Sequence, residues 1–205
     1  MSLFAYDQSI REEGFPLLCG VDEAGRGPLA GPVYAAAVIL PPEADLPLLR
    51  DSKKLTPKQR DRLFDQIREV AVAWCIADAS VEEIEELNIL QAAMLAMRRA
   101  VEGLAVAPDL VLVDGNRHPD TGKPERLVVG GDDTSACIAA ASILAKVSRD
   151  RKMLELDAAY PGYEFAKHKG YPTKLHYQKL TELGSCPAHR ESFLKKWRQK
   201  QSEST

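Results

Sequence analysis

Five short apolar runs occur along the chain, and most of them end at glycine, proline or acidic residues. Apolar runs of about four to eight residues with such boundaries indicate buried β-strands. The pattern therefore predicts strands over residues 17–21, 33–40, 71–79, 110–113 and 127–129.

Segments with helical spacing separate most of these strands. Two capping boxes, at residues 56–59 and 80–83, mark helix starts, and the second helix is predicted to run unbroken to a stop at Gly103. An alanine-rich helix is predicted over 135–159, Pro161-Gly162 ends it, and a shorter basic helical segment closes the chain. Strands that alternate with long helices predict an α/β fold.

Composition describes an ordinary globular protein, with 205 residues of which 45% are hydrophobic and 28% charged. No apolar run approaches the roughly 18 residues of a membrane span, so no membrane association is expected. The four cysteines form no C-x-x-C pair, which argues against a zinc site and a disulfide framework. We expect reduced thiols in a cytoplasmic protein, and a monomer.

The net charge of −3 hides an asymmetry along the chain. Residues 165–205 hold nine Lys or Arg against three Asp or Glu, whereas residues 1–164 are acidic. A basic tail beside an acidic body suits a phosphate-binding surface next to a carboxylate metal centre. A solvated basic helix would have the same composition, so both interpretations stay open.

Acidic residues follow three of the predicted strands: Asp22-Glu23, Asp114 and Asp132. Ligands of open α/β sheets gather outside the carboxyl ends of the strands, so these carboxylates could converge. Converging carboxylates repel one another unless hard divalent cations neutralise them, and two such ions can clamp a phosphate displacement. Each residue alone could equally belong to a turn or a helix cap. Because neighbouring side chains of a strand point to opposite faces, Asp22 and Glu23 can share a site only if the regular strand geometry gives way, that is ends, at Glu23.

The segment Asp22–Pro32 contains closely spaced glycines around Arg26. It matches neither a P-loop nor a dinucleotide fingerprint, because no Gly-Lys-Ser/Thr follows and its prolines oppose a helix start. Glycine allows close approach of a ligand to the backbone, which suits contacts to a sugar edge with Arg26 on a phosphate. The alternative is a tight turn that joins two strands.

The sequence of this segment, DEAGRGPLAGPV, resembles the signature of the type 2 ribonucleases H, and within them the bacterial ribonuclease HII family. The resemblance continues in the same order through six further segments. These are DSKKL (51–55), ELNIL (86–90), VDGN (113–116), GGD (130–132), AAASILAKVSRDR (139–151) and HKGYPT (168–173). Seven motifs in register are a specific signal, although each is weak alone.

The resemblance implies an RNase H-like mixed five-stranded sheet flanked by helices. It implies a catalytic domain over 1–160 and a small basic helical C-terminal segment over 161–205 that packs on it. The four catalytic, metal-binding acids would be Asp22, Glu23, Asp114 and Asp132. The backbone of Gly25, Arg26 and Gly27 would contact the ribose 2′-hydroxyl, and Tyr171 would stack on the deoxyribose after the ribonucleotide. Without the resemblance, Tyr171 would be taken for a rim aromatic that packs the C-terminal helix.

Four further positions resemble phosphate contacts in that family: Lys53, Lys54, Ser142 and Lys146. Ser142, Lys146 and Arg149 are spaced to share one helix face, which periodicity alone would describe equally well as a solvated stripe. His168 lies close to Tyr171 in sequence and could assist it.

The resemblance further implies an Mg²⁺- or Mn²⁺-dependent endonuclease active in ribonucleotide excision repair and DNA replication. Its substrates would be RNA–DNA hybrids and duplex DNA that contains ribonucleotides, cut on the 5′ side of a ribonucleotide to leave 3′-hydroxyl and 5′-phosphate ends. The related ribonuclease HIII family carries an N-terminal domain, and only about twenty residues precede Asp22 here. A nucleic-acid-binding module without catalysis is the other alternative, but four acids would repel phosphate unless metal is bound.

Overall fold

The computed structural model describes residues 2–49 and 55–203 and has one mixed sheet at its centre. The strand order is β3-β2-β1-β4-β5. Central β1 runs antiparallel to β2 and parallel to β4, while β3 pairs antiparallel with β2 and β5 parallel with β4. The strands are β1 (Leu18–Ala24), β2 (Val33–Ile39), β3 (Ala73–Ala79), β4 (Leu110–Asp114) and β5 (Glu125–Val128). The predicted α/β fold with a mixed five-stranded sheet is confirmed.

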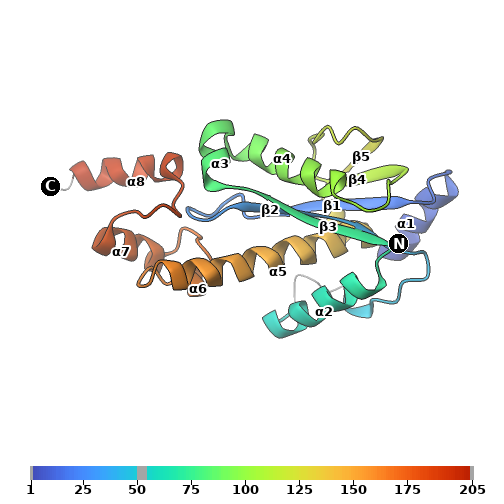
Figure 1. Ribbon diagram of the computed structural model, residues 1–205, viewed down its shortest axis with the longest axis horizontal. Coiled ribbons are helices and arrows are strands. Elements are labelled where there is room, and N and C mark those ends of the chain that lie inside the picture. Colours follow the sequence, from blue (N-terminus) through green and yellow to red (C-terminus); the bar gives the residue numbers. More distant parts are fainter. Residues whose placement is uncertain (1, 50–54, 204–205) are drawn as a thin grey trace.

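Helices cover both faces of the sheet, with α4 on one face and α5 and α2 on the other (Figure 1). The helices α6, α7 and α8 gather at one end of the molecule, and α1 lies at the other (Figure 1). The helices are α1 (Leu3–Glu12), α2 (Pro57–Val70), α3 (Val81–Leu87), α4 (Ile89–Glu102), α5 (Ala136–Ala159), α6 (Phe165–His168), α7 (Lys174–Leu183) and α8 (Glu191–Glu203), with a 3₁₀ turn η2 (Gly131–Asp133).

Helix α5 packs directly against the central strand β1. A Cβ atom at Gly20 would lie 2.2 Å from the carbonyl carbon of Cys137, so only glycine allows this approach. The first half of α5 is rich in fully buried alanines, which keep the helix close to the sheet. The contact fixes the position of α5 relative to the carboxyl end of β1, where Asp22 lies.

Three elements differ from the pattern-based predictions. The helix expected from 80 to 103 is divided at Asn88, which adopts a φ of 72° and caps α4 through its side chain. Helix α1 has no counterpart in the predictions, and its Asp7 carboxylate accepts a hydrogen bond from the Cys137 amide at the start of α5. The single closing helical segment is three helices, α6 to α8.

All four cysteines carry free thiols, as predicted. Cys19 is fully buried, and burial raises the pKa of its thiol to about 12, so it is no nucleophile. Among residues 2–49 and 55–203, no helix is both long and apolar enough to span a bilayer.

Candidate active site at the strand ends

Asp22 and Asp114 lie side by side at the carboxyl ends of two parallel strands. The register pairs Val21 with Val113, so the next residues along β1 and β4 are these two acids. Asp22 is buried, at 6% exposure, and its side chain receives a hydrogen bond from Ser142 on α5. The contact between α5 and β1 therefore places a helix side chain on a strand-end carboxylate.

Glu23 approaches Asp114 at the ends of β1 and β4, but from the other face of the sheet than Asp22. The expectation that β1 must give way at Glu23 is wrong, because β1 continues to Ala24 and stays paired with β2. Strand β4 ends at Asp114, however, so its pairing with β1 does not extend alongside Glu23. Glu23 and Asp114 consequently line one pocket of about 250 Å³, together with Arg26 and residues of α4 and of 115–117.

Asp132 lies in the turn η2, directly after a residue that binds Asp114. The Gly131 amide donates a hydrogen bond to Oδ1 of Asp114 at 2.6 Å. Asp132 is half-buried, whereas its neighbour Asp133 is exposed. The structure thus brings Asp22, Glu23 and Asp114 to the ends of β1 and β4, and Asp132 follows the Gly131 residue that binds Asp114.

Burial and neighbouring negative charge raise the pKa of two of these carboxyl groups, Asp22 and Glu23. Burial holds the pKa of Asp22 well above its usual value, and the negative charges of Glu23 and Asp114 add to this. Burial also raises the pKa of Glu23, although a hydrogen bond from Arg26 at 3.2 Å opposes the shift. Ionisation of these carboxyl groups is therefore unfavourable unless a cation is bound.

A divalent cation would relieve this repulsion, and the donor set suits one. Carboxylate oxygens are the ligands that Mg²⁺ and Mn²⁺ prefer. In the described part of the chain, no three His, Cys, Asp or Glu side chains form a compact ligand group for one ion. Mg²⁺ commonly takes only one or two carboxylates, with water and substrate phosphate as its other ligands. The site fits ions that are held by one or two carboxylates each, with water or a phosphate completing the coordination.

The glycine loop, residues 25–32, follows β1 directly. Gly25 has a φ of 104°, and a Cβ atom there would lie 2.1 Å from Nε of Arg149, so no other residue fits. Gly27 borders open space instead, and the nearest atom to a Cβ placed there is Cε1 of Tyr171 at 4.0 Å. Arg26 is half-exposed and pairs with Glu23 in this structure rather than extending into solvent.

Tyr171 lies beside the glycine loop and is 39% exposed. The Lys146 ammonium lies 5.7 Å and the Arg149 guanidinium 5.6 Å from its ring centroid, which are cation–π distances. Its carbonyl oxygen accepts a hydrogen bond from Nδ1 of His176 at 3.0 Å. The structure therefore brings together Gly27 and Tyr171, which are far apart in sequence.

His168 does not assist Tyr171 through its ring. Its two nitrogens bind the carbonyl of Tyr163 and the amide of Gly170, so the side chain supports the backbone before Tyr171. Burial lowers the pKa of His168 and that of His176, the latter to about 4. Both rings are thus neutral supports at physiological pH.

The predicted polar stripe on α5 is only partly correct. Ser142 and Lys146 are half-buried, and Lys146 pairs with Asp150 at 2.7 Å. Arg149 is fully buried and points into the protein, so its assignment to a surface stripe is wrong. Lys53 and Lys54 lie outside the described residues.

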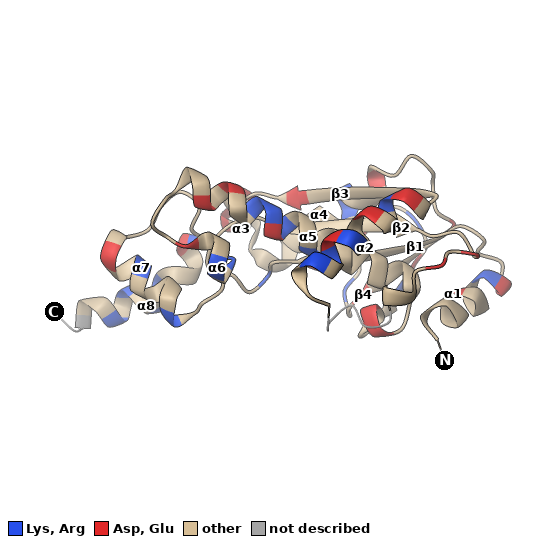
Figure 2. Ribbon diagram, turned by 90° about the horizontal axis from the view of Figure 1, so that it is seen from below, with Lys and Arg blue, Asp and Glu red and all other residues tan. Residues whose placement is uncertain are grey.

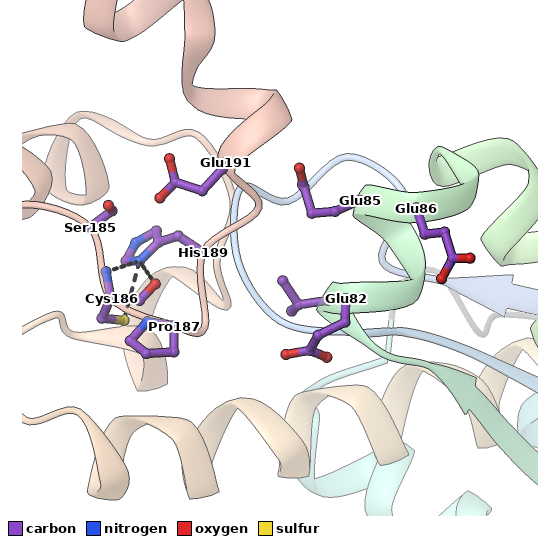
Figure 3. Close-up of a pocket in the computed structure, with 9 residues that line it drawn as sticks. Glu82, Glu85, Glu86, Ser185, Cys186, Pro187, His189 and Glu191 are labelled. Carbon is purple, nitrogen blue, oxygen red and sulfur yellow. Dashed lines mark hydrogen bonds between the residues drawn. The ribbon is translucent and has the colours of Figure 1, made fainter.

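Arg190, which the sequence patterns did not single out, is fully buried beneath the glycine loop. A lone arginine near the C-terminus resembles surface charge, and no motif marked it. The adjoining segment 185–191 forms, with α3, a hollow of about 700 Å³ (Figure 3). Glu82, Glu85, Glu86 and Glu191 line it, and His189 contacts Cys186 within it (Figure 3). Its acidic lining disfavours phosphate.

Comparison with known proteins agrees with this geometry. The family model described as Ribonuclease HII matches residues 19–198. The chain is 61% identical over 178 residues to the Ribonuclease HII of Laribacter hongkongensis, covering 86% of this chain and 90% of that protein. It is 56% identical over 177 residues to the Ribonuclease HII of Idiomarina loihiensis, covering 86% and 95% respectively. The crystal structure of the ribonuclease H2 from Pyrococcus horikoshii OT3 has a TM-score of 0.71 at 25% identity, covering 85% of this chain and 92% of that one.

Asp22→Asn should stabilise the metal-free protein at neutral pH. The folded-state pKa of Asp22 is raised, so ionisation costs stability as pH rises above the unfolded-state value near 3.8. Thermal melting in chelator should show the two proteins alike near pH 4 and the variant higher at pH 7. Each kcal/mol of relief would raise Tm by about 2–4 °C. Asp65→Asn, on the exposed face of α2, is the control; a variant that melts lower at pH 7 would contradict the proposed repulsion.

Proposed function

The chain belongs to the ribonuclease HII family, and we propose that it hydrolyses the RNA strand of RNA–DNA hybrids and cuts duplex DNA on the 5′ side of embedded ribonucleotides. As a member of this family it is a nuclease that hydrolyses phosphodiester bonds. The observation that carries the proposal is the cluster of Asp22, Glu23 and Asp114 at the ends of β1 and β4, where burial and neighbouring negative charge raise the pKa of Asp22 and of Glu23.

In the proposed mechanism, Asp22, Glu23, Asp114 and Asp132 would hold the catalytic metal ions between them, with water and substrate phosphate as the remaining ligands. Two Mg²⁺ or Mn²⁺ ions, when bound, supply an activated water and stabilise the departing 3′-oxygen of the cut strand. Ser142 orients Asp22 through its hydrogen bond, and the Gly131 amide orients Asp114. Products carry 3′-hydroxyl and 5′-phosphate ends, and no protein nucleophile forms a covalent intermediate.

Recognition of the ribonucleotide is assigned to the glycine loop and Tyr171. The open space beside Gly27 allows a sugar to approach the backbone of Gly25, Arg26 and Gly27. The exposed ring of Tyr171 borders the same space and can stack on the following deoxyribose. The 2′-hydroxyl is the group that distinguishes ribose from deoxyribose at this position. Arg26 can exchange Glu23 for a phosphate when metal neutralises the carboxylate.

The basic C-terminal segment, residues 161–205, is proposed to pack on the catalytic domain of residues 1–160 and to contact the duplex backbone. Figure 2 shows Lys and Arg along α8 and on α6. Lys195 and Lys196 are exposed on α8. Lys146 on α5 is assigned to the same set of phosphate contacts, as are Lys53 and Lys54.

Cleavage should require a divalent metal and Asp22. Digestion of duplex DNA that carries one ribonucleotide should proceed with Mg²⁺ or Mn²⁺ and stop in chelator. Asp22→Asn should lower kcat by more than about 100-fold, since changes to outer-shell metal partners alone cost about 10–100-fold. Asp65→Asn should cut like the wild type. Cleavage in chelator, or by Asp22→Asn at the wild-type rate, would rule out the mechanism.

Tyr171→Ala should reduce cleavage mainly where DNA follows the ribonucleotide. Removal of one stacked ring is worth about 1 kcal/mol, or roughly fivefold in kcat/KM. The measurement compares kcat/KM of the variant and the wild type on two substrates: duplex DNA with one embedded ribonucleotide, and a continuous RNA–DNA hybrid. Tyr171→Phe keeps the ring and should behave like the wild type. An equal reduction on both substrates, or none on either, would mean that Tyr171 is not the junction sensor.

Replacing Lys195 and Lys196 by glutamine should flatten the salt dependence of duplex binding. Each lysine that no longer neutralises a phosphate reduces the slope of log K against log salt by about 0.9, because fewer counterions are released. Lys58→Gln with Lys123→Gln removes the same charge from exposed positions away from the C-terminal helices and should leave the slope nearly unchanged. If both double variants change the slope alike, α8 does not bind the duplex specifically.

A further inference from the structure

We propose that Arg149 and Arg190 are positioning residues that hold the glycine loop against Tyr171 and thereby set the preference for ribose over deoxyribose. Both side chains are fully buried, at 0% exposure. They come from separate elements, since Arg149 lies on α5 and Arg190 precedes α8. The inference rests on the proposed function, because it concerns how the same loop selects its substrate.

Arg190 binds the glycine loop from the inside. Its Nη2 donates to the carbonyl of Gly25 at 2.7 Å, and its Nη1 donates to those of Arg26 at 3.2 Å and Pro28 at 2.9 Å. Its Nε donates to the carbonyl of Gly31 at 2.9 Å. One guanidinium thus fixes four peptide groups of an eight-residue loop, which a lysine, with donors at a single atom, could not span.

These bonds determine where the loop directs its amides. In a planar trans peptide the carbonyl and the following N–H point in opposite directions. With the Gly25 and Arg26 carbonyls turned inward to Arg190, the amides of Arg26 and Gly27 point outward. Gly27 borders the open space next to Tyr171, so these outward amides are placed to donate to a sugar hydroxyl.

Arg149 connects the loop with Tyr171. Its guanidinium donates to the carbonyl of Ala30 at 3.2 Å and, through Nη1, to that of Lys169 at 3.1 Å. It also lies 5.6 Å from the Tyr171 ring centroid and occupies the space where a Cβ of residue 25 would be. A loop that moved relative to Tyr171 would have to break these contacts.

Backbone bonds complete the connection. The Leu29 amide donates to the Gly170 carbonyl at 2.8 Å, and the Arg190 amide donates to the Leu29 carbonyl at 2.8 Å. The hydrogen bonds of the two guanidinium groups within the described residues go to carbonyls and to Met153 sulfur, with no carboxylate among them. Burying two cations whose hydrogen bonds go to neutral groups is costly. Apolar side chains could pack the loop without this cost, so the two arginines indicate a role in holding its carbonyls.

The test measures how strongly the whole enzyme, with Mg²⁺, prefers duplex DNA that contains a ribonucleotide over duplex DNA without one. KM is measured for duplex DNA with one ribonucleotide, and Ki for the same duplex made entirely of DNA and used as a competitor. Arg190→Lys and Arg149→Lys should each raise KM about 5–10-fold, the equivalent of one hydrogen bond to the sugar. Ki should stay unchanged, because backbone phosphates are bound elsewhere. Exposed Arg151→Lys on α5 and Arg62→Lys on α2 are the matched controls and should leave the ratio of Ki to KM unchanged.

A second measurement separates positioning from folding. Low concentrations of guanidinium ion should restore the Ki to KM ratio of Arg190→Ala, whereas methylammonium at equal ionic strength should not. Reduced activity on all substrates with an unchanged ratio, in whichever lysine variant folds, would overturn the inference. A wild-type enzyme that binds both duplexes equally would instead contradict the proposed function.

Discussion

The approach of α5 to β1 at Gly20 is the steric constraint on which the site depends. Because a Cβ at this point would collide with the Cys137 backbone, the helix axis is fixed relative to the strand. Ser142 then meets Asp22 further along the helix, and Lys146 and Arg149 meet Tyr171 over the next two turns. A single helix therefore aligns the acids with the glycine loop and Tyr171.

The sequence predicted the strands, most helices and the positions of the acids well, because alternation of short apolar runs and capped helices is a local signal. It could not predict the break at Asn88, where apolar spacing continues across a residue with positive φ. Arg149 was placed on the surface because its spacing from Ser142 and Lys146 suggested a polar face. Only tertiary contacts show that its guanidinium is enclosed by loop carbonyls. Arg190 was missed for the same reason.

The acids also show how a regular sheet can concentrate charge. Asp22 and Glu23 face opposite sides of an unbroken strand, so alternation alone would separate them. Strand β4 ends at Asp114, so no β4 backbone lies beside Glu23 to separate the two faces of the sheet. The Gly131 amide holds the Asp114 side chain at this strand end. The protein keeps the resulting repulsion in the metal-free state, at a cost in stability that fits a site built for cations.

The space shared by Gly25 and Arg149 has a consequence for how this chain can vary. Since Nε of Arg149 lies 2.1 Å from where a Cβ of residue 25 would be, the two positions cannot change independently. Any side chain at position 25 would displace the guanidinium from the carbonyls of Ala30 and Pro32. Effects of substitutions at the two positions should therefore be strongly non-additive, since the first would already remove what the second disrupts. Gly25 and Arg149, which are far apart in sequence, are thus coupled energetically through one shared space.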